Sequence, residues 1–132
     1  MKKNKVLVKY HEPYNLQQVF NAVWEWAKTH EINYDPDDNR ICLYRNYNNT
    51  NACFIGACIP DCFYTKDIEK AGVEFLEESL LSKIFNDYLV NNAYILDKLQ
   101  RIHDNSVGQQ KEQIFDSLRR FAESFNLVVP TK

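Results

Sequence analysis

The sequence predicts an α+β fold that is predominantly helical, with four or five helices packed around one β-hairpin. Two observations favour this fold class. Most of the chain repeats apolar residues at the spacing of one helical face, whereas residues 41–64 do not. Within residues 41–64, two runs rich in aliphatic and aromatic residues flank a polar link at residues 46–51, a pattern typical of a hairpin.

Length and composition predict one folded domain. The chain has 132 residues, and 45% of them are hydrophobic, which is enough to fill a core. We interpret residues 1–14 as a basic N-terminal arm, in which Val6 and Val8 either form a short strand or belong to a flexible tail. Residues 15–132 are expected to form a single globular domain.

Charge and hydropathy exclude several classes of partner. A formal net charge of −2 argues against general nucleic-acid binding, which is typical of basic domains. Every apolar run is shorter than the roughly 18–20 residues of a membrane span, so no membrane partner is expected. The N-terminal residues lack a signal-peptide pattern, so we expect a cytoplasmic protein with reduced thiols.

The first helix is predicted to begin at Asn15, which forms a capping-box pattern with Gln18, and to end near His30. Trp24 is expected to lie off its core stripe, where an exposed ring would stack on a base, anchor a protein partner or lie under the basic arm. The apolar face of this helix comprises Leu16, Val19, Phe20, Val23, Trp26 and Ala27.

The predicted hairpin has strands near residues 41–46 and 52–59. A turn-forming run at residues 35–39 precedes it. Pro60 is expected to end the second strand, because proline cannot donate a hydrogen bond within a central ladder. Residues 64–73 are predicted to contain one short helical turn.

Three further helices are predicted, with a separator at residues 105–108 before the last one, and an apolar tail at residues 127–130 is expected to fold back on the core. Their apolar stripes are Phe75, Leu76, Leu80, Ile84, Phe85 and Tyr88; Tyr94, Ile95, Leu99, Ile102 and His103; and Ile114, Phe115, Leu118, Phe121, Ala122 and Phe125. The expected buried core is Phe20, Val23, Phe54, Ile55, Leu80, Ile84, Leu99, Ile102, Leu118 and Phe121.

Four cysteines lie within the predicted hairpin region, at positions that do not favour a zinc site. Zinc ribbons and knuckles favour pairs of cysteines two residues apart, because such a pair reaches one metal from one tight turn. A bulge at Gly56 would be needed to bring Cys53 and Cys58 to one face of a strand. We therefore expect free thiols that pack as small apolar residues, without bound metal: Cys42, Cys53, Cys58 and Cys62.

Arg45 is predicted to be paired, because an arginine on an otherwise apolar strand requires an anionic or carbonyl partner. Asp61 or Asp104 would supply this partner within the fold, whereas a phosphate or carboxylate would supply it in a binding site. Gly56 either marks a bulge or lets backbone amides approach a ligand closely. The candidate ligand-binding residues are Tyr44, Arg45, Gly56, Asp61, Tyr64, His103 and Asp104, and no catalytic or metal-binding residue is assigned.

His103 has two interpretations. It is either the base for a cysteine nucleophile, or a partly buried residue whose charge favours the C-terminal end of its helix. Adjacent helix positions project about 100° apart, so His103 and Asp104 are not expected to form a pair.

Three motifs follow one another along the chain, namely Cys42-Leu43-Tyr44-Arg45, Cys53-x-Ile55-Gly56-x-x-Ile59-Pro60-Asp61-x-x-Tyr64 and Leu99-Gln100-x-Ile102-His103-Asp104. In this order they resemble a family of small, mostly uncharacterised proteins of tailed phages and prophages, over about residues 15–127. The chain departs from that family in its longer link at residues 46–51, in Ala52 where a basic residue is usual, and in Cys62 where an acidic residue is common.

The resemblance, together with the residue types, favours a non-enzymatic phage or prophage protein that antagonises a host pathway in the host cytosol. One mode would be sequestration of a nucleotide-derived immune signal in a pocket, with aromatic residues for the base and arginine for the phosphate. No cofactor is expected. The alternatives are a protein-interaction inhibitor of a host enzyme, and a Cys/His-dependent enzyme that acts on a nucleotide signal.

Overall fold

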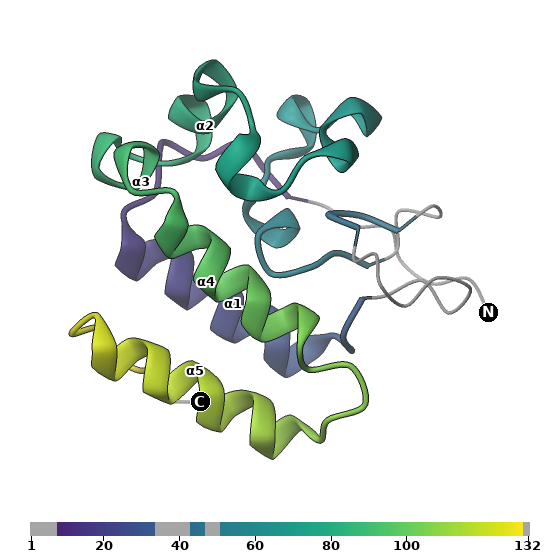
Figure 1. Ribbon diagram of the computed structural model, residues 1–132, viewed down its shortest axis with the longest axis vertical. Coiled ribbons are helices and arrows are strands. Elements are labelled where there is room, and N and C mark those ends of the chain that lie inside the picture. Colours follow the sequence, from purple (N-terminus) through teal and green to yellow (C-terminus); the bar gives the residue numbers. More distant parts are fainter. Residues whose placement is uncertain (1–7, 34–42, 47–50, 131–132) are drawn as a thin grey trace.

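The computed structural model describes residues 8–33, 43–46 and 51–130. Over these residues the chain folds into α-helices joined by short 3₁₀ helices (Figure 1). The helices α1, α4 and α5 pack together, and α2, α3 and the 3₁₀ helices lie on the other side of α4 from α5. The α-helices are α1 (Leu16–Thr29), α2 (Glu78–Ile84), α3 (Asp87–Asn91), α4 (Tyr94–Asp104) and α5 (Lys111–Ser124). The 3₁₀ helices are η1 (Gly56–Cys58), η2 (Asp61–Phe63), η3 (Lys66–Lys70) and η4 (Val73–Phe75).

The predicted β-hairpin, and with it the α+β fold class, is wrong for the part of the chain that the structure describes. An isolated antiparallel bridge joins Arg45 to Ala52, and the chain then winds into η1 where the second strand was expected. The reason lies in burial, because residues 52–60 are all buried and show no alternation between two faces. A continuous apolar run does not distinguish a strand from a buried turn. Residues 41–42 and 47–50 of the predicted hairpin lie outside the described residues.

Helix α1 confirms the predicted first helix and its start. The Asn15 side chain accepts the Gln18 N–H, and the Gln18 side chain accepts the Asn15 N–H, as in a capping box. Trp24, however, is buried against Phe115 of α5, so the prediction that it lies off the core is wrong. Both α5 and η1 pack on α1, and its buried face is therefore wider than a single stripe.

The predicted second long helix is broken into η4, α2 and α3. The break between α2 and α3 falls at Phe85, which is extended and forms a parallel bridge with Tyr14. Asn86 then begins a new helix, since its side chain accepts the Leu89 N–H as an N-cap. The hydrophobic stripe continues across this break, which explains why periodicity alone predicted one helix.

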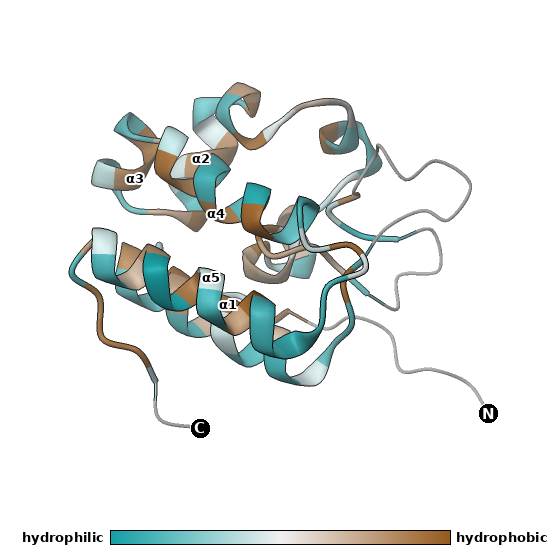
Figure 2. Cartoon of the chain, turned by 60° about the horizontal axis from the view of Figure 1, so that its bottom comes forward, coloured by the Kyte–Doolittle hydropathy of each residue, from teal (hydrophilic) through white to brown (hydrophobic). Residues whose placement is uncertain are grey.

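The predicted last two helices are confirmed as α4 and α5, and the short turn expected within residues 64–73 is confirmed as η3. Asn126 follows α5 with a φ of 57°, a left-handed conformation that lets the Leu127 N–H reach the Ala122 carbonyl. The hydrophobic tail that follows, brown in Figure 2, folds back as predicted: Leu127 packs against the core, and Gln17 bonds the backbone of Val128.

The predicted core is largely confirmed. Eight of its ten members are buried, whereas Leu80 and Ile102 are only partly buried. The described part of the N-terminal arm is hydrogen-bonded to this body, since the Val8 carbonyl accepts the Asp61 N–H and Tyr14 bonds the backbone on both sides of Phe85. Among the described residues, every helix falls short of the length and apolar character needed to cross a lipid bilayer.

Candidate functional site

Arg45 is buried, with 4% of its surface exposed, and it has a carboxylate partner as predicted. Its Nη2 atom lies 2.7 Å from Asp61 Oδ1 and donates to the Ile59 carbonyl at 2.7 Å. The guanidinium also lies over the Tyr64 ring, 4.6 Å from the centroid. Of the two acids considered from the sequence, Asp61 is therefore the partner, and it lies at the start of η2.

Glu69, on η3, completes this first network, and the sequence analysis missed it. Its carboxylate accepts the backbone N–H of Tyr44 at 2.8 Å and that of Arg45 at 3.0 Å, together with the Tyr64 hydroxyl. Burial, followed by the hydrogen bond to Glu69, raises the pKa of Tyr64 above its ordinary value. Burial likewise raises the pKa of Tyr44, whose hydroxyl donates to the Ala71 carbonyl at 2.8 Å. The hydroxyl groups of both tyrosines are therefore hydrogen-bonded within the protein.

Gly56 does not mark a bulge in a strand, because it begins the 3₁₀ helix η1. A Cβ atom at this position would lie 2.0 Å from the Tyr44 carbonyl oxygen, so only glycine fits where η1 begins. The residue therefore allows the close approach of two backbone segments.

His103 and Asp104 belong to a second network, and the prediction that they do not pair is wrong. His103 is 1% exposed, and its Nδ1 lies 3.2 Å from Asp104 Oδ1. Its Nε2 accepts the Asn33 N–H at 3.1 Å, which leaves the proton of a neutral ring on Nδ1. The separation of about 100° describes the directions in which the two side chains leave the helix. It does not fix the position of the Asp104 carboxylate, which reaches the neighbouring ring. Gln100 closes the network by donating to Asp104 at 3.1 Å and accepting the Ile55 N–H at 3.0 Å.

The two buried cysteines lack the properties of a nucleophile. Cys53 and Cys58 are buried, and burial raises the pKa of both thiols, that of Cys58 to about 12. A thiol with such a pKa stays protonated near neutral pH, whereas the thiolate is the reactive form. Cys62 is exposed, contrary to the expectation that it packs in the core, and Cys42 lies outside the described residues. In the described part of the chain, no three histidine, cysteine or acidic side chains gather where they could hold a metal ion.

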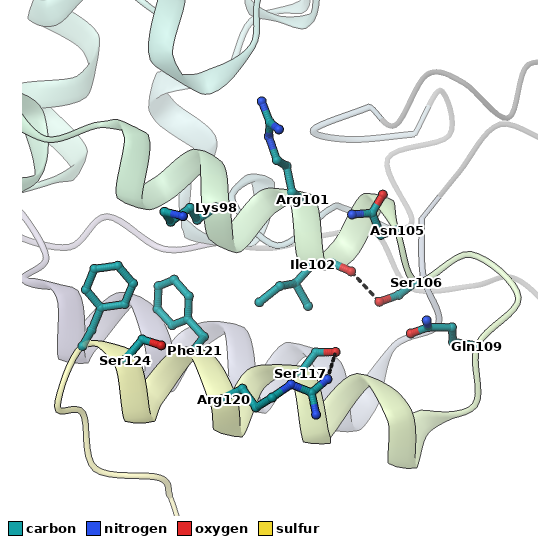
Figure 3. A pocket seen from close by; sticks show the side chains of 11 residues that line it. Lys98, Arg101, Ile102, Asn105, Ser106, Gln109, Ser117, Arg120, Phe121 and Ser124 are labelled. Atoms are coloured by element: carbon teal, nitrogen blue, oxygen red, sulfur yellow. Dashed lines mark hydrogen bonds between the residues drawn. The ribbon is translucent and has the colours of Figure 1, made fainter.

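A groove between α4 and α5 has a volume of about 520 Å³, and its lining includes none of the seven predicted residues. We call it the α4–α5 groove. Figure 3 shows Ile102 pointing from α4, and Phe121 from α5, into the space between the two helices. The described lining combines apolar residues (Ile102, Phe121, Phe125), cations (Lys98, Arg101, Arg120) and uncharged polar residues (Asn105, Ser106, Gln109, Ser117, Ser124).

The cations of the α4–α5 groove differ in their availability. Arg101 bonds Asp97 at 2.7 Å, and in Figure 3 its side chain points away from the groove. Arg120 donates from Nη2 to Ser117 Oγ at 3.3 Å. Lys98 forms no hydrogen bond or ion pair with the described residues. The lining that the structure describes contains no acidic residue and no histidine, so Lys98 on α4 and Arg120 on α5 give both sides of the groove a positive charge.

The serine hydroxyl groups of the groove have no acidic residue or histidine beside them in the described lining. A general base is needed to activate a serine hydroxyl, and the described lining offers none beside Ser106, Ser117 or Ser124. Ser106, just past the end of α4, instead donates to the Ile102 carbonyl. An apolar floor with a cation on each side complements a molecule that has a flat apolar part and an anionic part.

The sequence analysis missed this groove because each helix supplies only half of it. Lys98 and Arg120 stand beside the apolar stripes of their helices, and such residues normally form a solvated face. Only the packing of α4 on α5 brings the two edges together.

Comparison of the chain with protein-family models, with curated proteins and with solved structures gave no match in any of the three.

Proposed function

We propose that the chain is a non-enzymatic binding protein that holds an anionic small molecule of the nucleotide class in the α4–α5 groove. The observation that carries this proposal is the pairing of apolar side chains with Lys98 and Arg120 in a described lining without acidic residues. A phosphate gains most from arginine, which presents several N–H donors in one plane, and from the point charge of lysine.

Each part of the groove has a role in this proposal. Lys98 and Arg120 bind the phosphate, while Phe125 and Ile102 contact the base. The tilted arrangement of Phe121 and Phe125, with ring centroids 4.7 Å apart, forms an aromatic wall for such a contact. Gln109 and Ser117 line the same groove and supply polar groups for the sugar or the base edge.

The resemblance to the phage family supports a wider role for this binding. A phage-encoded protein that holds a nucleotide-derived signal in the host cytosol would antagonise a host pathway by sequestration, without chemical turnover. The proposed contacts differ from the seven predicted residues, because the polar groups of those residues already bind protein partners.

Two measurements on the purified protein test the proposal. Mass spectrometry of small molecules released on denaturation identifies a bound nucleotide, and calorimetric titration with a panel of nucleoside mono-, di- and triphosphates and cyclic dinucleotides gives its affinity. Removing one charged hydrogen-bond donor costs roughly 1.5–3 kcal/mol, so Arg120→Gln is expected to weaken binding about tenfold or more.

Arg119→Gln is the matched control. Arg119 is the neighbouring arginine on α5, but it pairs with Asp116 at 2.8 Å and does not line the groove. Binding should be nearly unchanged in this variant. A protein that releases no nucleotide and binds none of the panel, or two variants with equal affinity, would contradict the proposal.

A further inference from the structure

A second hollow, of about 470 Å³, lies among η2, η3, η4 and α2. We call it the η3–α2 hollow. Its apolar lining includes Phe63, Ile68, Phe75 and Leu80. Phe75 is 82% exposed, the largest exposed fraction among the exposed large apolar residues of the described chain. A phenyl ring held in water at the edge of an apolar hollow gains free energy when a partner covers it.

Carboxylates outnumber lysines around this hollow, although Lys66, on η3, is also exposed beside its lining residues in the chain. Asp67 and Glu77 line it, and Glu74 and Glu78 are exposed beside its lining residues in the chain. The side chains of these four residues form no ion pair or hydrogen bond with the described residues. Lys83 is the one cation in the described lining, and its Nζ lies over the Phe63 ring, 5.5 Å from the centroid. The acidic groups are therefore free to meet a basic partner.

We propose that the η3–α2 hollow is a docking surface for a basic amphipathic helix of a protein partner. An apolar side chain of the partner enters the hollow beside Phe75, and lysines or arginines on its flanks face Asp67, Glu74, Glu77 and Glu78. The aromatic anchor and the ring of complementary charge match the usual composition of an interface of this kind. A second copy of this chain fits less well, because two copies of one acidic surface repel each other when they meet face to face.

This surface is independent of the proposed nucleotide groove. In Figure 1, η3, η4 and α2 lie on one side of α4, and α5 lies on the other. The described linings of the two hollows share no residue. A variant at the η3–α2 hollow should therefore retain any nucleotide binding, which separates a failure of this inference from a failure of the proposed function.

The probe for this surface is a pair of synthetic helical peptides, each roughly four turns long. Both carry leucine and phenylalanine on one face of the helix. On the opposite face, one peptide carries lysine and its counterpart carries glutamate. Binding is measured by fluorescence anisotropy of the labelled peptides on the full chain. The lysine peptide is expected to bind, and Phe75→Ala and Glu77→Lys are each expected to weaken it about tenfold.

Tyr88→Ala is the matched control, because Tyr88 is also exposed, at 57%, but does not line the hollow. Circular dichroism checks that each variant is folded, and the exposure of Phe75 predicts that its removal leaves the fold intact. The proposal is overturned if the lysine peptide fails to bind, if both peptides bind equally, or if Phe75→Ala binds as the unsubstituted protein does. Self-association that Phe75→Ala abolishes, with no peptide binding, would assign the surface to a second copy and also overturn it.

Discussion

At the scale of single residues, Arg45 illustrates how one polar side chain can organise a buried region. Its guanidinium joins η2 to the segment before Ala52 through Asp61 and the Ile59 carbonyl. Glu69 accepts the backbone N–H groups of Arg45 and of Tyr44 before it. A buried arginine is costly without such partners, and residues 59–64 supply those of its guanidinium.

Removal of this arginine should therefore lower stability. We expect Arg45→Ala to reduce the free energy of unfolding by about 2–4 kcal/mol, because it leaves a cavity and a buried Ile59 carbonyl without its donor. The value is below that of a fully buried pair, since the Asp61 side chain is 38% exposed and stays partly hydrated. Chemical denaturation of the variant measures the loss.

Arg101→Ala is the control for charge alone, because its side chain is 71% exposed and pairs with Asp97 within one helix. Its effect should stay within about 0.5 kcal/mol. If Arg45→Ala were as stable as Arg101→Ala, the internal pairing would not be what holds Arg45 in place.

At the scale of elements, the C-terminus of α1 is joined to the start of α5. Lys111 donates from Nζ to the carbonyl groups of Ala27 and His30, which are among the unsatisfied carbonyls at the end of α1. The His30 ring stacks on Trp26, with centroids 3.5 Å apart. Burial, with a smaller contribution from the charge of Lys111, holds the pKa of His30 below its usual value.

This lowered pKa predicts a pH dependence of stability. Because the unfolded chain binds the proton of His30 more readily, the contribution of this residue is complete above about pH 6.5 and is lost as the pH falls through the lower pKa of the folded state. Thermal melts between pH 7.5 and 5.5 should show a larger fall in Tm for the unsubstituted protein than for His30→Gln. Equal falls in the two proteins would contradict this account of His30.

The elements also show what periodicity and capping can predict. The starts and ends of α1, α4 and α5 follow from their apolar stripes and from caps such as Asn15 and Asn126. The break at Phe85 depends on a pairing with Tyr14, some seventy residues away, which local patterns do not contain. Residues 52–60 are buried on every side and therefore offer no period from which a turn could be told from a strand.

At the scale of the whole molecule, the two polar networks lie apart from the α4–α5 groove, whose described lining includes none of their residues. The seven residues predicted for binding were chosen for their chemistry, and the structure places most of them within these networks. In the sequence, Lys98 and Arg120 of the α4–α5 groove resemble ordinary solvent-facing positions, and only the packing of the two helices brings them beside one groove. The sequence thus indicated which polar side chains would need partners, but it did not indicate which side chains would be exposed to a ligand.

The central claim is that a nucleotide binds between α4 and α5 and not at Arg45. Nuclear magnetic resonance of the isotopically labelled protein, titrated with a nucleotide that binds, tests it most directly. The account predicts that the methyl signals of Ile102 and the ring signals of Phe121 shift on titration, while the Arg45 side-chain and Tyr64 signals stay unchanged. Shifts at Arg45 and Tyr64, with the signals of Ile102 and Phe121 unmoved, would contradict it.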